Sequence, residues 1–135
     1  MTVTSPSVKK LTRNDVSWMS PNSKSHQAGI NLPLKSFRTM FSYLIEDESE
    51  NAPREELVTK WFTEEGEIIA EKSCEVVRYH SKNELRLVNI PARLLAQHLE
   101  EGLFLLIRKI ESTLHITVLG FNPIHLLSEF EGLVD

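Results

Sequence analysis

The chain has 135 residues, of which 41% are hydrophobic and 25% charged, and these values predict one globular domain over residues 1–135 with a sizeable core. A net charge of −4 disfavours a generic nucleic-acid binder, which is expected to be basic. No apolar run approaches the roughly 20 residues that span a bilayer, no secretory signal is evident, and the single Cys74 fits a reducing compartment, so we expect a cytoplasmic protein without membrane contact.

The first predicted unit is a pair of short strands joined by a long polar loop. Strands are expected at residues 8–11 and 28–32, and the loop over residues 14–25 is rich in Ser and Asn. Loops of this length are usually functional or disordered, and attachment to a strand at both ends favours a functional loop. The loop leads into His26, whose ring can face a ligand. An equally weighted alternative is that His26 anchors the loop through hydrogen bonds.

The next segment has helical periodicity. Apolar residues recur at helical spacing after Pro33, namely Leu34, Phe37, Phe41 and Leu44. Proline is favoured in the first helical turn, so an amphipathic helix is predicted over residues 33–45. The acidic stretch 46–55 that follows is predicted to be a solvated loop.

The remainder of the chain is rich in β-branched and aromatic residues. Strands are expected over residues 57–63, 67–80, 85–88, 103–110 and 115–120, with turns at 64–67, 80–83 and 111–113. Helices are expected over residues 92–101, ended by Gly102, and from Asn122 to Phe130. Because strands and helices do not alternate, we predict an α+β, mainly β fold: a bent antiparallel open barrel of about seven strands with two flanking helices.

Charge is distributed unevenly along the chain. Residues 1–45 carry six basic side chains against one acidic one, and residues 46–75 carry eleven acidic side chains against three basic ones. Two segments are both basic and polar: residues 13–27 and residues 78–86 (RYHSKNELR). Arg, Lys, Asn, Gln and Glu are the side chains that read base edges. On composition alone, an exposed hairpin turn is the simpler interpretation of residues 78–86.

Signals for catalysis are few. The sequence contains no zinc-type Cys/His spacing, no P-loop, no dinucleotide glycine pattern and no G-x-S-x-G turn. Glu67, Glu71 and Lys72 resemble part of a metal-dependent nuclease site, but a solvent-facing strand surface is the favoured interpretation. Cys74 is predicted to be a small buried residue. We therefore predict no catalytic residue, metal site or cofactor in this domain.

Two motifs resemble a known family. The order K-L-T-x-N-D at residues 10–15, followed by S-H-Q-A-G-I-N-L-P at residues 25–33, resembles the N-terminal effector-binding domain of EcoRII-like Type II restriction endonucleases. The K-N-E-x-R pattern at residues 82–86 and the terminal hairpin are similar to later segments of that domain. Close matching covers about a third of the chain.

The resemblance implies a DNA-binding pseudobarrel that grips the major groove of double-stranded DNA with two arms. Family members recognise short duplex sites, in the founding case a CCWGG-type sequence, and the domain itself does not cleave DNA. The resemblance also implies that the chain is the N-terminal part of a longer restriction enzyme of bacterial defence. A Mg-dependent nuclease domain would follow in the parent chain.

We name residues 13–27 the first arm and residues 78–86 the second arm. Candidate DNA contacts in or beside the first arm are Lys10, Arg13, Asn14, Asp15, Asn22, Ser23, Lys24, Ser25, His26 and Gln27. Candidate contacts of the second arm are Arg78, Tyr79, Ser81, Lys82, Asn83, Glu84 and Arg86. His26 and the arginines are expected at base edges, and Lys10, Lys24 and Lys82 at phosphates.

Two functions of other classes stay open. The acidic residues 46–67 are compatible with a stand-alone protein-interaction module. The carboxylates on the strand from Glu67 to Glu71 are compatible with a small enzyme, which is the weaker of these alternatives.

Overall fold

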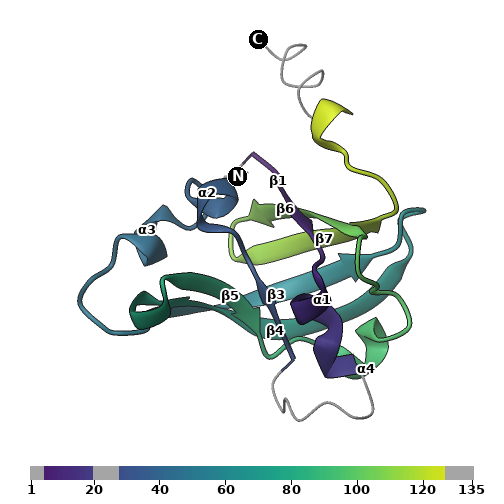
Figure 1. The fold of residues 1–135 in the computed structure, drawn as a ribbon. Helices are drawn as coiled ribbons and strands as arrows, with labels where there is room; N and C mark the ends of the chain where they lie inside the picture. Colours follow the sequence, from purple (N-terminus) through teal and green to yellow (C-terminus); the bar gives the residue numbers. More distant parts are fainter. Residues whose placement is uncertain (1–4, 20–27, 127–135) are drawn as a thin grey trace.

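The computed structural model describes residues 5–19 and 28–126, which form a curled sheet flanked by short helices (Figure 1). The strands are β1 (Ser7–Lys10), β2 (Gly29–Asn31), β3 (Arg54–Phe62), β4 (Ile68–Tyr79), β5 (Glu84–Val88), β6 (Phe104–Ile110) and β7 (Thr113–Leu119). The helical segments are α1 (Arg13–Val16), η1 (Ser17–Met19), α2 (Leu34–Phe37), α3 (Ser42–Ile45), η2 (His80–Lys82) and α4 (Ala92–Leu95). The mainly β architecture of a half-open barrel agrees with the prediction.

The strand order is β1-β6-β7-β3-β4-β5-β2, so that β1 and β2 form the two edges of the described sheet. All neighbouring strands pair antiparallel except β3 and β7, which run parallel. The sheet is mainly antiparallel, as predicted, and the parallel pairing of β3 with β7 is the exception. Its cause is topological. The β3–β4–β5 meander and the β6–β7 hairpin are joined through α4, and this crossover brings β7 beside β3 in the same direction.

The inner face of the sheet forms the core. Leu57, Thr59 and Trp61 alternate along β3 with partly or fully exposed residues, as expected for a strand with one buried face. Thr59 is the polar member of this row, and its hydroxyl donates to the carbonyl oxygen of Lys72 at 2.9 Å and accepts from Nε1 of Trp61 at 2.8 Å. Cys74 is buried beside it, as predicted, and burial raises the pKa of its thiol.

The two long predicted helices are shorter in the structure. The segment 33–45 forms α2 and α3, separated by a turn at residues 38–41, although its apolar residues Phe37, Phe41 and Leu44 are buried as predicted. Hydroxyl side chains recur through this segment at Ser36, Thr39 and Ser42, and they favour turns over continuous helix.

The segment after Pro91 likewise forms only α4 and then turns. Gly102 has a φ of 93°, the left-handed conformation expected where this segment ends, and its N–H donates to the carbonyl oxygen of Leu11. The last predicted helix begins at residues 124–126, and its continuation to Phe130 lies outside the described residues. Among the helices of residues 5–19 and 28–126, none has the length and apolar character needed to cross a bilayer.

In the view of Figure 1, α2 and α3 lie at the upper left and α1 and α4 at the lower right. The element α1 was not predicted, because residues 14–25 were interpreted as loop throughout. It starts after Thr12, whose N–H and hydroxyl both donate to the Asp15 carboxylate at 2.8 Å. This is half of a capping box, formed with Asp in the place of the usual Glu or Gln.

Candidate nucleic-acid interface

The outer face of β2, β4 and β5 lies between Ala28, which follows the first arm, and the turn at residues 80–83 of the second arm. In β5, Arg86 is paired with Asn31 of β2 and with Val77 of β4, while Val88 is paired with Gly29 and Glu75. Because side chains alternate along strands, these residues share one face of the sheet. The turn at residues 80–83 of the second arm leads into the first residue of β5, and Ala28, which follows the first arm, leads into β2, which begins opposite the last residue of β5. Ala28 and the turn at residues 80–83 therefore adjoin opposite ends of β5.

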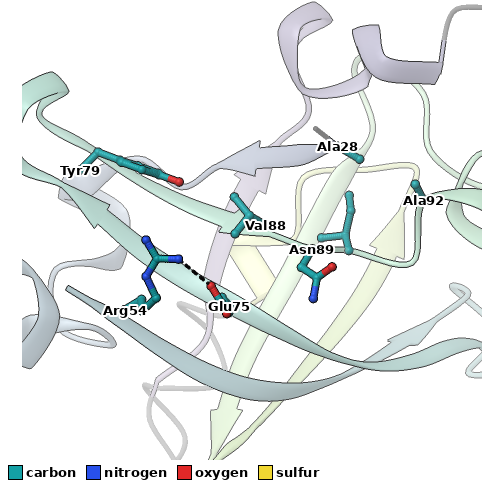
Figure 2. Close-up of a pocket in the computed structure, with 8 residues that line it drawn as sticks. Ala28, Arg54, Glu75, Tyr79, Val88, Asn89 and Ala92 are labelled. Atoms are coloured by element: carbon teal, nitrogen blue, oxygen red, sulfur yellow. Dashed lines mark hydrogen bonds and ion pairs between the residues drawn. The ribbon is translucent and has the colours of Figure 1, made fainter. Parts of the chain in front are cut away.

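This outer face contains a cavity of about 450 Å³. Its lining residues come from both sides of β5 and from the loop that follows it: Ala28, Arg54, Glu75, Tyr79, Val88, Asn89, Ile90 and Ala92. Figure 2 shows Val88 between Tyr79 and Ala92, with Arg54 and Glu75 paired beside them. Nη1 of Arg54 lies 3.1 Å from Oε2 of Glu75. The cavity is therefore lined both by Ala28, the residue after the first arm, and by Tyr79 of the second arm.

Arg86 occupies the middle of the same face. Its Nη2 atom lies 3.2 Å from the position that a Cβ atom would take on Gly29, so the absence of a side chain at Gly29 makes room for the guanidinium group. The Nε atom of Arg86 is buried and donates to no acceptor within the described part of the chain. Buried donors normally have partners, and Nε of Arg78 lacks one among the described residues as well, so both guanidinium groups are candidate ligand contacts.

The tip of the second arm is exposed at Ser81, Lys82 and Asn83. Asn83 adopts a left-handed conformation with a φ of 53° and closes the turn predicted at residues 80–83. The Lys82 ammonium lies 6.0 Å from the centre of the Tyr79 ring, within cation–π range. Glu84 is half-buried at the start of β5.

Arg78 lies behind this tip. Its side chain is 8% exposed, and Nη2 donates to Oδ1 of Asn83 at 2.9 Å while Nη1 donates to the carbonyl oxygen of Glu84 at 3.4 Å. These contacts let Arg78 fix the turn, while its expected contact with a base edge stays a prediction.

Asp15 has a structural role too. It is 3% exposed, and its Oδ2 lies 2.9 Å from the ammonium group of Lys9 in β1, while its Oδ1 accepts from the N–H of Asn31 in β2 at 3.0 Å. One carboxylate therefore joins the two edge strands across the opening of the barrel. Burial alone would raise the pKa of Asp15, but hydrogen bonds from Thr12, Lys9 and Asn31 outweigh it and lower the pKa below the usual value.

The other first-arm candidates in the described residues are exposed: Lys10, Arg13 and Asn14. The ammonium group of Lys10 lies 5.9 Å from the centre of the Phe104 ring, at the β1 edge. Six candidates lie outside the described residues, namely Asn22, Ser23, Lys24, Ser25, His26 and Gln27.

Three residues of this face were missed by the sequence analysis. Gly29 carried a usable signal, because an isolated glycine within a strand often marks the close approach of another group. Arg54 was assigned to the acidic loop, and nothing in its neighbourhood predicted its pairing with Glu75. Asn89 has a φ of 63°, a conformation that asparagine tolerates, and it follows β5 directly.

The acidic loop lies against the second arm. Nε2 of His80 lies 2.6 Å from the carbonyl oxygen of Asp47, and the N–H of His80 donates to the carbonyl oxygen of Asn51. The exposed acidic side chains here would repel a polyanion, so this side of the arm disfavours phosphate.

The carboxylates considered for catalysis are dispersed. Glu67 and Glu71 are both exposed, and Oε1 of Glu71 lies 3.6 Å from the Lys60 ammonium group. Within residues 5–19 and 28–126, no group of three His, Cys, Asp or Glu side chains could hold a metal ion.

Comparison with known proteins adds no assignment: no protein-family model and no curated protein sequence matches the chain.

Proposed function

We propose that the chain is a sequence-specific recognition domain for double-stranded DNA that holds the major groove between its two arms. The observation that carries this proposal is the cavity, because it is lined both by Ala28, the residue after the first arm, and by Tyr79 of the second arm. Arg86 lies on the same face, and its buried Nε atom has no acceptor among residues 5–19 and 28–126. This face has side chains that can read base edges.

The length of β5 suits a duplex. Ala28 and the turn at residues 80–83 adjoin opposite ends of β5, whose first and last residues are four steps apart, or roughly 14 Å at about 3.4 Å per residue. The major groove of B-form DNA is about 12 Å wide. The length of β5 is therefore close to the width of the major groove.

Each side chain has a distinct proposed role. Arg86 contacts a base edge, since a guanidinium group donates two parallel hydrogen bonds to guanine. Lys82 and Ser81 at the exposed tip contact phosphates, with Lys10, Arg13 and Asn14 available on the other side. By the family resemblance, Lys24 and His26 complete the first arm, and the target is of the CCWGG type. Cleavage would belong to a Mg-dependent nuclease domain of the parent protein.

Selection from a randomised duplex pool, followed by binding at a series of salt concentrations, tests this function. We expect enrichment of one short motif and an affinity that falls steeply with salt, because phosphate contacts release counterions. Lys82→Ala should weaken binding to all duplexes about equally and reduce the salt slope by about 1. Lys35→Ala is the matched control, since Lys35 is an exposed lysine on α2, which packs beside β1.

Three results would count against the proposal. Failure to enrich any motif would exclude sequence-specific recognition, and equal effects of Lys82→Ala and Lys35→Ala would remove the second arm from the interface. Metal-dependent cleavage by the isolated chain, abolished by Glu71→Gln, would favour the enzyme alternative instead.

A further inference from the structure

The cavity on the outer face of the sheet has walls suited to a single nucleobase. Val88, Ala28 and Ala92 contribute apolar surface, and the half-buried Tyr79 contributes an aromatic ring (Figure 2). Pockets that receive a base turned out of a duplex hold it between aromatic and apolar side chains. A volume of about 450 Å³ lies within the usual range for small-ligand sites and accommodates one base with its sugar.

The polar groups of the cavity match the pairing edge of a base. The Arg54 guanidinium and the Glu75 carboxylate lie side by side at 3.1 Å, so they present hydrogen-bond donors next to acceptors. Asn89 adds an amide that both donates and accepts, and the ammonium of Lys72 donates to its Oδ1 at 3.3 Å. Every base has neighbouring hydrogen-bond donors and acceptors on its pairing edge. When a base is extruded, these groups lose their hydrogen bonds to the opposite base.

We propose that this cavity receives one base extruded from the bound duplex. The domain would then recognise an unpaired base in addition to the major groove. The inference rests on the proposed DNA-recognition function. The location of the cavity supports it, because Ala28, which follows the first arm, and Tyr79 of the second arm both line the cavity. Extrusion costs least where pairing is already weak, so a mismatched base at the same position should bind better.

The test uses the duplex selected from the randomised pool, with 2-aminopurine placed at each position of its motif in turn. Binding should raise the fluorescence at one position, because the base leaves the stack there. A mismatch at that position should tighten binding by about tenfold. Ala92→Phe fills the cavity and should abolish both effects. Leu94→Phe is the matched control, since Leu94 is exposed on the same helix and does not line the cavity.

Tyr79→Leu provides a second variant if Ala92→Phe does not fold, as judged by circular dichroism, and it should reduce the fluorescence change by removing the ring. Duplex binding without a fluorescence rise at any position, or a rise that survives both substitutions, would overturn the base pocket and leave the proposed function intact. No binding to any duplex of the pool would overturn both.

Discussion

Replacing Asp15 by Ala is expected to lower the free energy of unfolding by about 3–5 kcal/mol, the range found when one partner of a buried ion pair is removed. The substitution would leave the Lys9 ammonium buried without its carboxylate, since the two side chains are 4% and 3% exposed. It would also leave the Asn31 N–H without the acceptor that now lies 3.0 Å away. Urea denaturation followed by circular dichroism measures the loss.

The double substitution Lys9→Met with Asp15→Leu is the matched control. It removes both charges and keeps apolar volume, so its stability should stay within about 1 kcal/mol of the parent chain or exceed it. A double variant as unstable as Asp15→Ala would show that the hydrogen bonds to Thr12 and Asn31 matter more than the charge pair.

The dependence of stability on pH follows from the same site. The pKa of Asp15 is lower in the folded chain than in the unfolded chain. The contribution of Asp15 to the free energy of unfolding is therefore fully present above the unfolded pKa of about 3.9. This stabilisation is lost as the pH falls through the pKa that Asp15 has in the folded chain. On acidification, the free energy of unfolding should therefore decrease less in the double variant than in the parent chain.

The sheet could largely be predicted from the sequence, because alternation of buried and exposed residues is a local property. The β5 strand and the turn before it were found within one residue of their observed limits. The parallel pairing of β3 with β7 could not be predicted, since it depends on how two distant meanders meet. Helix lengths were overestimated, because the spacing of apolar residues indicates which side chains are buried. It does not indicate where turns interrupt the helix.

The candidate site was predicted only in part. Residue type revealed that Arg78 and Asp15 were charged, but not that both are buried and bound to neighbours. Gly29 and Arg54 were missed because their importance depends on partners 57 and 21 positions away, Arg86 and Glu75. Sequence motifs predicted the two arms, while the outer face of β2, β4 and β5 became visible only when the strands were paired.

Replacing Arg86 by Ala is expected to relax selection at one base position by about 1–3 kcal/mol, the discrimination that a good bidentate contact supplies. Arg86→Lys should retain most of the salt dependence and lose most of that discrimination, because an ammonium group lacks the planar fork. Repeating the duplex selection with each variant measures both effects. An unchanged motif in Arg86→Ala would exclude this residue from base contact.

Gly29→Ala tests the same contact without touching the arginine. A Cβ atom there would lie 3.2 Å from Nη2 of Arg86 and 3.3 Å from the carbonyl oxygen of Leu87, so the guanidinium group must move. The motif should weaken at the position that Arg86→Ala affects, and the two substitutions together should cost less than the sum of their separate effects. Gly120→Ala is the matched control, because a Cβ atom there comes no closer than 3.8 Å to a neighbour. If Gly29→Ala selected the parent motif with parent affinity, Arg86 would read no base from its present position, and the groove contact would have to be assigned to the first arm.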